Sequence, residues 1–141
     1  MTLKLLVFIH ILGACIWVGG HLILIFRYLP QALKNKDVAL INDYESKYEW
    51  LGIPALLTQI ITGIWIGNLY DLQFLHFGNH RDLVFNLKLI TLVATLLLAL
   101  HARISIIPKL KASNLSFLAL HILLVSLLAL TFVYLGVSFR L

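Results

Sequence analysis

Histidines account for most of the chemistry that this sequence could perform. The chain has six of them, but only one cysteine, Cys15, and only one methionine, the first residue. Four histidines stand inside long apolar runs: His10, His21, His101 and His121. An ionisable side chain at membrane depth is costly, so it usually faces the protein interior and has a partner. Because imidazole binds copper, zinc and haem iron, these residues predict a metal or haem site.

The elements that must position these histidines are long apolar helices. The composition is 61% hydrophobic and 12% charged, with a mean hydropathy of +0.97, which is far more apolar than a soluble domain. Four apolar stretches reach the roughly 20 residues that a helix needs to cross a bilayer. We therefore predict an all-α fold, an integral membrane bundle of four transmembrane helices in one domain, 1–141. The expected helices are about 3–27, 50–70, 83–108 and 115–138.

Basic residues are sorted between the loops. The first loop region carries four of them and the third carries three, whereas the opposite side carries three. The positive-inside rule then places loops 28–49 and 109–114 in the cytoplasm and both termini in the periplasm. The residues counted are Arg27, Lys34, Lys36, Lys47, Arg103, Lys109 and Lys111 on one side, and Lys4, Arg81 and Arg140 on the other. Because this basic excess is sorted by topology, it does not indicate nucleic-acid binding.

The depths of the histidines, at 1.5 Å per helical residue, suggest two levels. His21, His101 and His121 fall in one layer in the cytoplasmic half, on three different helices. In the outer half, His10 lies level with Lys88. The layer predicts a metal site, but each histidine could equally form a hydrogen bond to a hydroxyl group of a neighbouring helix. Lys88 could likewise extend to the interface along its aliphatic stem.

Helical rotation supports part of this arrangement. His10 and His21 are eleven residues apart, so they share a face with only about 20° between them and roughly 16 Å along the axis. Lys88 and His101 differ by roughly 140°, so they cannot both point at the bundle axis. One of those two side chains is therefore expected to point at a neighbouring helix.

Small and aromatic residues on the first helix suggest room for a flat ligand. Gly20, with Gly13 and Gly19, would let a macrocycle or another helix approach the backbone closely. Trp17 is one turn from His21 and could pack on such a ring.

The segment before the third helix holds two further histidines. His76 and His80 are spaced i and i+4, which could hold a metal if the segment were helical. Gly78 lies between them and favours an exposed loop instead.

Several function classes are excluded by missing motifs. The sequence has no nucleotide-binding glycine loop, nucleophile elbow, zinc-protease motif or paired carboxylate, so hydrolytic enzymes are disfavoured. Redox chemistry remains open because a bound cofactor would supply it. If the chain is an enzyme, we expect a haem-dependent membrane oxidoreductase.

The opening helix resembles that of a known family. The run from Ile9 to Gly20, with a histidine followed by Trp-x-Gly-Gly, resembles the first helix of the copper-resistance protein D (CopD) family. The stretch from Leu87 to Leu110, with its lysine and Pro-x-Leu ending, and the stretch from Tyr44 to Gly63 resemble two further helices of that family. This resemblance implies a bacterial inner-membrane protein that binds and handles copper.

A second family is similar in size and helix number. HemJ-type protoporphyrinogen oxidases have an early histidine on helix one and a lysine on helix three, taken as important for haem b and activity. His10 and Lys88 match these two positions, and the run from Pro54 to Thr58, followed by Gly63, resembles that family's second helix. The Gly20-His21 pair departs from this family and is closer to CopD.

Two functions therefore compete. In the first, His76, His80 and His10 collect copper, and the inner histidine layer passes it inward. Copper(I) pathways favour sulfur ligands, however, and this chain offers Cys15 alone, so a histidine-only site suits copper(II) or haem b better. In the second, histidines hold haem b in a redox protein. An accessory subunit in which the histidines only pack is a third alternative. The expected partners are the lipid bilayer and a metal ion or haem. A second copy of the chain or a membrane redox protein is a further candidate partner.

Overall fold

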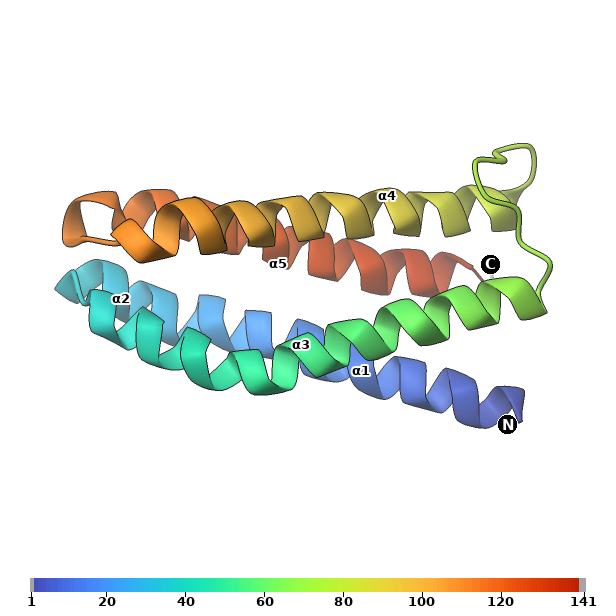
Figure 1. Ribbon diagram of the computed structural model, residues 1–141, viewed down its shortest axis with the longest axis horizontal. Helices are drawn as coiled ribbons and strands as arrows, with labels where there is room; N and C mark the ends of the chain where they lie inside the picture. Colours follow the sequence, from blue (N-terminus) through green and yellow to red (C-terminus); the bar gives the residue numbers. More distant parts are fainter. Residues whose placement is uncertain (1, 140–141) are drawn as a thin grey trace.

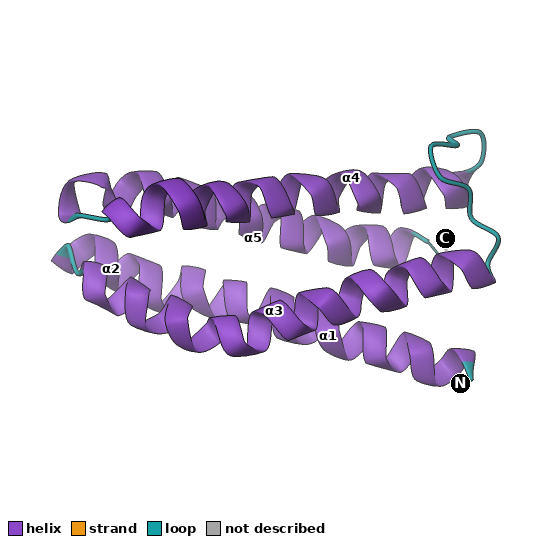
Figure 2. Ribbon diagram, in the orientation of Figure 1, coloured by secondary structure: helices purple, strands orange, loops and turns teal. Residues whose placement is uncertain are grey.

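A computed structural model describes residues 2–139. It is an all-α four-helix bundle, and its four long helices are long and apolar enough to span a membrane (Figures 1 and 2). The first consists of α1 (Leu3–Ile23), η1 (Leu24–Tyr28) and α2 (Leu29–Asn35), and the second is α3 (Val38–Leu69). The third consists of α4 (His80–His101), η2 (Ala102–Ile106) and η3 (Ile107–Lys109), and the last of η4 (Ala112–Asn114) and α5 (Leu115–Ser138).

The first loop is far shorter than the expected 28–49 segment. Helix α2 continues to Asn35, and α3 begins at Val38 after a turn at Lys36 and Asp37. Lys36 is left-handed, with φ of 54°, and the Asp37 side chain caps α3 by accepting from the Leu40 backbone N–H at 3.1 Å. Hydropathy missed the start of α3 because its first turns carry charges on the outer face.

Two π-helical segments each precede a proline. Segment η1 ends two residues before Pro30, and η2 ends two residues before Pro108. A proline ring cannot donate an amide hydrogen bond and clashes with the carbonyl four residues earlier, so a widened turn relieves the clash. Pro54 lies inside α3, which bends near its middle in Figure 1.

Helix α5 is the centre of the bundle. Within an apolar stretch of 18 residues in each helix, 44% of the residues are buried for the last helix and 22% for α3. Helix α1 packs on α3 and α5, and α4 packs on α5, but α3 and α4 barely touch. The large apolar side chains left exposed around the bundle, such as Phe8, Leu57 and Leu97, suit contact with lipid.

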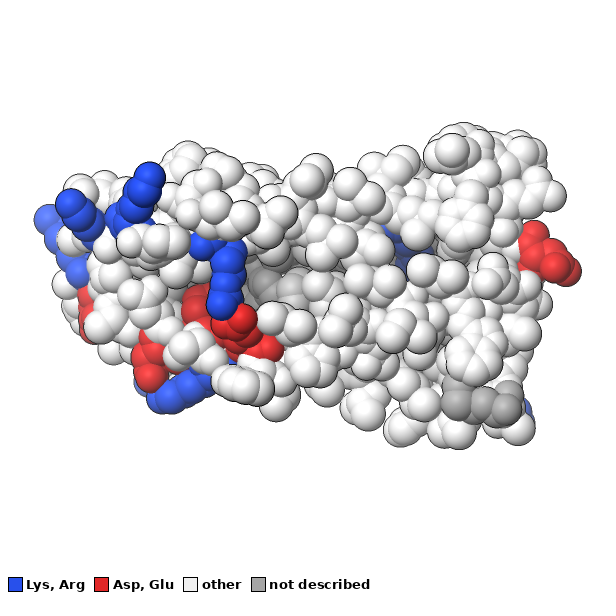
Figure 3. Space-filling view, viewed as in Figure 1, with Lys and Arg blue, Asp and Glu red and all other residues white. Residues whose placement is uncertain are grey.

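Most of the charged side chains and the chain termini lie at opposite ends of the bundle. Basic and acidic side chains gather over the end that holds α2 and the start of α3, and the middle is almost uncharged (Figure 3). The chain's first and last helices both reach the opposite end, beside the 71–79 loop (Figure 1). This separation matches the sorting of basic residues seen in the sequence.

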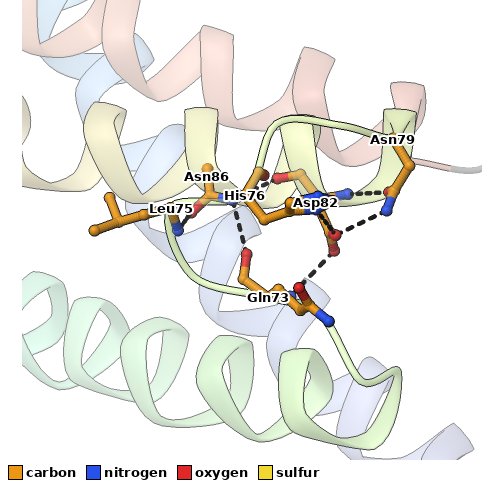
Figure 4. Close-up of polar contacts among 6 residues, drawn as sticks. All are labelled: Gln73, Leu75, His76, Asn79, Asp82 and Asn86. Carbon is orange, nitrogen blue, oxygen red and sulfur yellow. Dashed lines mark hydrogen bonds and ion pairs between the residues drawn. The ribbon is translucent and has the colours of Figure 1, made fainter.

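The 71–79 loop is held down by two buried side chains of α4 (Figure 4). The Asp82 carboxylate accepts from the Gln73 backbone N–H at 3.1 Å, from His76 Nδ1 at 2.6 Å and from Asn79 Nδ2 at 2.8 Å. The Asn86 side chain accepts from the Leu75 backbone N–H at 2.8 Å and donates to the Gln73 and His76 carbonyls. Both residues are at most 4% exposed, so the loop is part of the fold.

Candidate functional site

His10 is fixed against α3 in the half of the bundle that holds the chain termini. Its Nδ1 lies 2.7 Å from Thr62 Oγ1, and the Thr62 hydroxyl donates to the Thr58 carbonyl. Since that hydroxyl already uses its proton, His10 must donate from Nδ1, and its Nε2 keeps a lone pair. Gly63 leaves room for this ring, because a Cβ there would lie 3.2 Å from His10 Cε1. This is the orientation that a ligating histidine usually has.

Lys88 approaches the same interior region from α4. Its side chain is half-buried and lies within electrostatic range of His10. Its Nζ reaches α5, where a Cβ added at Gly136 would lie 3.5 Å away. Within residues 2–139 Lys88 forms no ion pair. A cation placed in this way attracts a carboxylate or another anion.

His101 and His121 form a pair between α4 and α5. His101 Nδ1 lies 2.9 Å from His121 Nε2, and His121 Nδ1 donates to the Phe117 carbonyl at 3.1 Å. With both rings neutral, His101 donates to His121, so the remaining lone pair is at His101 Nε2. His101 is exposed and His121 is buried. His101 therefore points at the neighbouring helix α5, as the sequence predicted for one of His101 and Lys88.

His21 belongs to an aromatic wall formed by α1 and α3. Its Nδ1 donates to the Trp17 carbonyl at 2.9 Å, which leaves a lone pair on Nε2. Its ring centroid lies 4.5 Å from that of Trp17 and 5.7 Å from that of Tyr48. The Tyr48 hydroxyl donates to the Trp17 carbonyl at 2.9 Å and so ties α3 to α1.

The glycines of α1 serve helix packing. A Cβ at Gly20 would lie 2.0 Å from the Tyr48 ring, so this glycine admits α3 and not a macrocycle. The Tyr44 hydroxyl also donates to the Gly20 carbonyl at 2.6 Å. Gly13 packs against Gln59 and Ala55, whereas Gly19 faces open space.

A groove of about 390 Å³ lies beside this wall in the half of the bundle nearest α2. His21 and His121 contribute to its lining from α1 and α5, together with Trp17 and Tyr48. Apolar side chains of α3 and α4 form much of the remainder. The groove follows the seam where α3 and α4 fail to pack.

The charged end of this groove could not be predicted from the sequence. Arg103 Nη1 pairs with Glu49 Oε2 at 2.6 Å across the seam, and Glu45 also lines the groove. The spacing of Ile41, Tyr44 and Tyr48 could have revealed that this segment is a helix packed on α1. Nothing in the sequence pairs Glu49 with Arg103.

The expected metal clusters are not assembled among the described residues. In residues 2–139 no group of three or more His, Cys, Asp or Glu side chains could hold a metal ion. His101 and His121 meet, but His21 lies on another wall of the groove. His76 lies in the 71–79 loop and forms a hydrogen bond to Asp82. His80 is the first residue of α4, and its Nε2 donates to the Ser138 carbonyl at 2.8 Å.

Comparisons with known proteins found no match. No protein-family model, no curated protein and no solved structure is significantly similar to this chain.

Proposed function

We propose that this chain is a membrane redox protein that binds haem b in the outer half of the bundle, through His10 and Lys88. The observation that carries this proposal is an oriented imidazole that keeps a lone pair, together with a half-buried cation on α4 that helix length places level with it and that has no ion-pair partner among residues 2–139. A b-type haem needs such an imidazole for its iron, and its propionates suit a cation. The donor set therefore fits the cofactor.

The chain's own residues would act as follows. His10 ligates through Nε2, Thr62 holds the ring and its tautomer from the other side, and Lys88 neutralises a propionate. Bound haem b supplies one-electron chemistry at its iron. If the chain is catalytic, the resemblance to HemJ-type proteins favours a haem-dependent oxidoreductase that acts on a porphyrinogen.

The groove is a poorer haem site than the His10 region. Glu45 and Glu49 outnumber Arg103 at its charged end, so two propionates placed there would meet excess negative charge. His121 would also have to give up its bond from His101.

Removal of His10 tests the haem site. We expect His10→Ala to lower the haem content of the purified protein at least about tenfold, since even partners of a ligand typically change affinity by that factor. Lys88→Met should weaken retention, and Lys88→Arg should restore most of it. The haem content is measured from the Soret absorbance per chain. His80→Ala, which loses only a surface bond, is the matched control. Equal haem in His10→Ala and His80→Ala would contradict the assignment.

Copper at the His101–His121 pair is the second candidate. Two nitrogens about 2.0 Å from one metal, at about 90°, lie about 2.9 Å apart. The separation of His101 Nδ1 and His121 Nε2 is 2.9 Å, so a metal could replace the shared proton with little movement. Copper(II) accepts imidazole ligands, and the CopD resemblance favours this metal.

The end that carries most of the basic residues is proposed to face the cytoplasm, with the termini in the periplasm of a bacterial inner membrane. In a Cys15→Ser background, Asn35→Cys should resist an impermeant thiol reagent in intact cells until the membrane is opened. Phe77→Cys, in the opposite loop, should label at once. The reverse pattern would invert the topology.

A further inference from the structure

The groove opens sideways toward the bilayer along its apolar lining. Its lining includes side chains that are also exposed on the outer surface: Ile53 at 48%, Leu57 at 53%, Leu96 at 40% and Leu100 at 56%. These residues flank the seam between α3 and α4, onto which Figure 3 looks. A ligand that dissolves in lipid can reach the groove through this seam, so the natural occupant is a membrane-soluble molecule.

The inner wall of the groove carries an unused hydrogen-bond donor. Trp17 is 9% exposed, and its buried Nε1 has no hydrogen-bond partner among the described residues. A buried N–H without a partner is rare and destabilising, so a missing acceptor is expected near it. Trp17 lines the groove, so a carbonyl oxygen of a ligand there would supply that acceptor once the indole turned its N–H to the groove surface.

Two acceptors accompany this donor. His21 Nε2 keeps a lone pair, and Glu45 forms no hydrogen bond or ion pair among the described residues. One donor and two acceptors suit a ring whose oxygens are carbonyl groups when it is oxidised and hydroxyl groups when it is reduced. The flat faces of Trp17 and Tyr48, with centroids 6.4 Å apart, suit an aromatic or quinonoid ring.

Charge decides between an anionic and a neutral head group. Arg103 is already paired with Glu49, and Glu45 adds a further carboxylate. A carboxylate or phosphate head would be repelled there, so ordinary anionic lipids and haem propionates are disfavoured. A neutral head with an apolar tail fits both the polar end and the apolar seam.

We propose that this groove binds an isoprenoid quinone, as the electron acceptor of the haem protein proposed above, on which that role rests. The quinone head lies against Trp17 and His21, and its tail leaves along the seam past Leu57 and Leu96. The unpartnered Trp17 N–H donates to one carbonyl oxygen. His21 Nε2 or Glu45 accepts from the hydroxyl of the reduced form.

The reduction balances in electrons and protons. A quinone becomes a quinol by taking two electrons and two protons, and one O–H bond forms at each carbonyl oxygen. The two electrons would pass one at a time through the proposed haem from the porphyrinogen named under the proposed function, which loses two electrons and two protons for each quinone reduced. The protons come from water at the charged end of the groove, where Glu45 can carry them.

Binding is measured with decylubiquinone, a short-tailed probe. The full-length chain in detergent is mixed with increasing probe, separated from free probe by gel filtration, and extracted to quantify quinone per chain. We expect saturation at about one per chain and at least about tenfold weaker retention of decylbenzene, which has the tail without the carbonyls. Equal, non-saturating retention of both compounds would mean that the groove takes up only alkyl chains, and would overturn the assignment.

Two variants locate the probe. Trp17→Phe removes the donor but keeps a ring, and should weaken binding about three- to tenfold, with Trp65→Phe as its matched control. Leu57→Phe narrows the seam and should also weaken binding, with Ile61→Phe one turn away as its control. Wild-type affinity in both Trp17→Phe and Leu57→Phe would overturn the placement.

The Soret absorbance of the same samples separates the two proposals. Haem without saturable quinone binding would overturn the quinone site alone. Saturable quinone binding without haem would overturn the proposed function and leave the quinone site standing.

Discussion

Gly20→Ala should lower the free energy of unfolding by about 2–4 kcal/mol, the sum of overpacking and a lost hydrogen bond. The new Cβ would stand 2.0 Å from the Tyr48 ring, so that ring must move. It cannot turn freely, because Gly52 of α3 also lies against it and its hydroxyl is bonded to the Trp17 carbonyl. Moving it breaks the link between α1 and α3. The measurement is thermal unfolding of the protein in detergent.

Gly19→Ala is the matched control for this prediction. A Cβ at Gly19 meets nothing within 4 Å, and alanine is the better helix former, so stability should be unchanged or rise by up to about 1 kcal/mol. Equal stability of Gly20→Ala and Gly19→Ala would contradict the close packing of Tyr48 on α1.

The second large effect is expected at Asn86, which ties the 71–79 loop to α4. Asn86→Leu leaves the Leu75 N–H and the Gln73 and His76 carbonyls without their partner, in a position that is 2% exposed. Each buried polar group without a hydrogen-bond partner costs about 1–3 kcal/mol. Because water can reach some of these groups, we expect the free energy of unfolding to fall by about 3 kcal/mol. The loop should also become sensitive to protease, which is the direct measurement.

Asn35→Ala is the control for Asn86→Leu. Asn35 is exposed at the end of α2 and forms no side-chain hydrogen bond among the described residues, so stability and cleavage should stay as in the wild type. If Asn86→Leu were cleaved no faster than Asn35→Ala, the loop would not depend on Asn86.

The sequence predicted the fold class well because apolar length alone identifies a spanning helix. It placed the start of α3 about twelve residues late, since charges on the outer face hid the side that packs on α1. The π-helical segments were also missed, although each sits just before a proline that could have signalled it.

The candidate site was only partly visible in the sequence. Depth placed His10 level with Lys88 and His101 level with His121, and in the structure the His101 and His121 rings meet at 2.9 Å. The three-histidine layer did not assemble in the described residues because His21 is turned to the Trp17 carbonyl. The groove, the unpartnered Trp17 N–H and the Glu49–Arg103 pair depend on how α3 and α4 diverge, which no local pattern encodes.

The most direct test of haem binding is the absorption spectrum of the purified protein, oxidised and reduced, with copper and iron measured on the same sample. We expect a Soret band that shifts on reduction and about one iron per chain, as b-type haem held by a histidine gives. A colourless protein that carries copper would contradict the haem proposal and favour the His101–His121 pair. A colourless protein without either metal would contradict both.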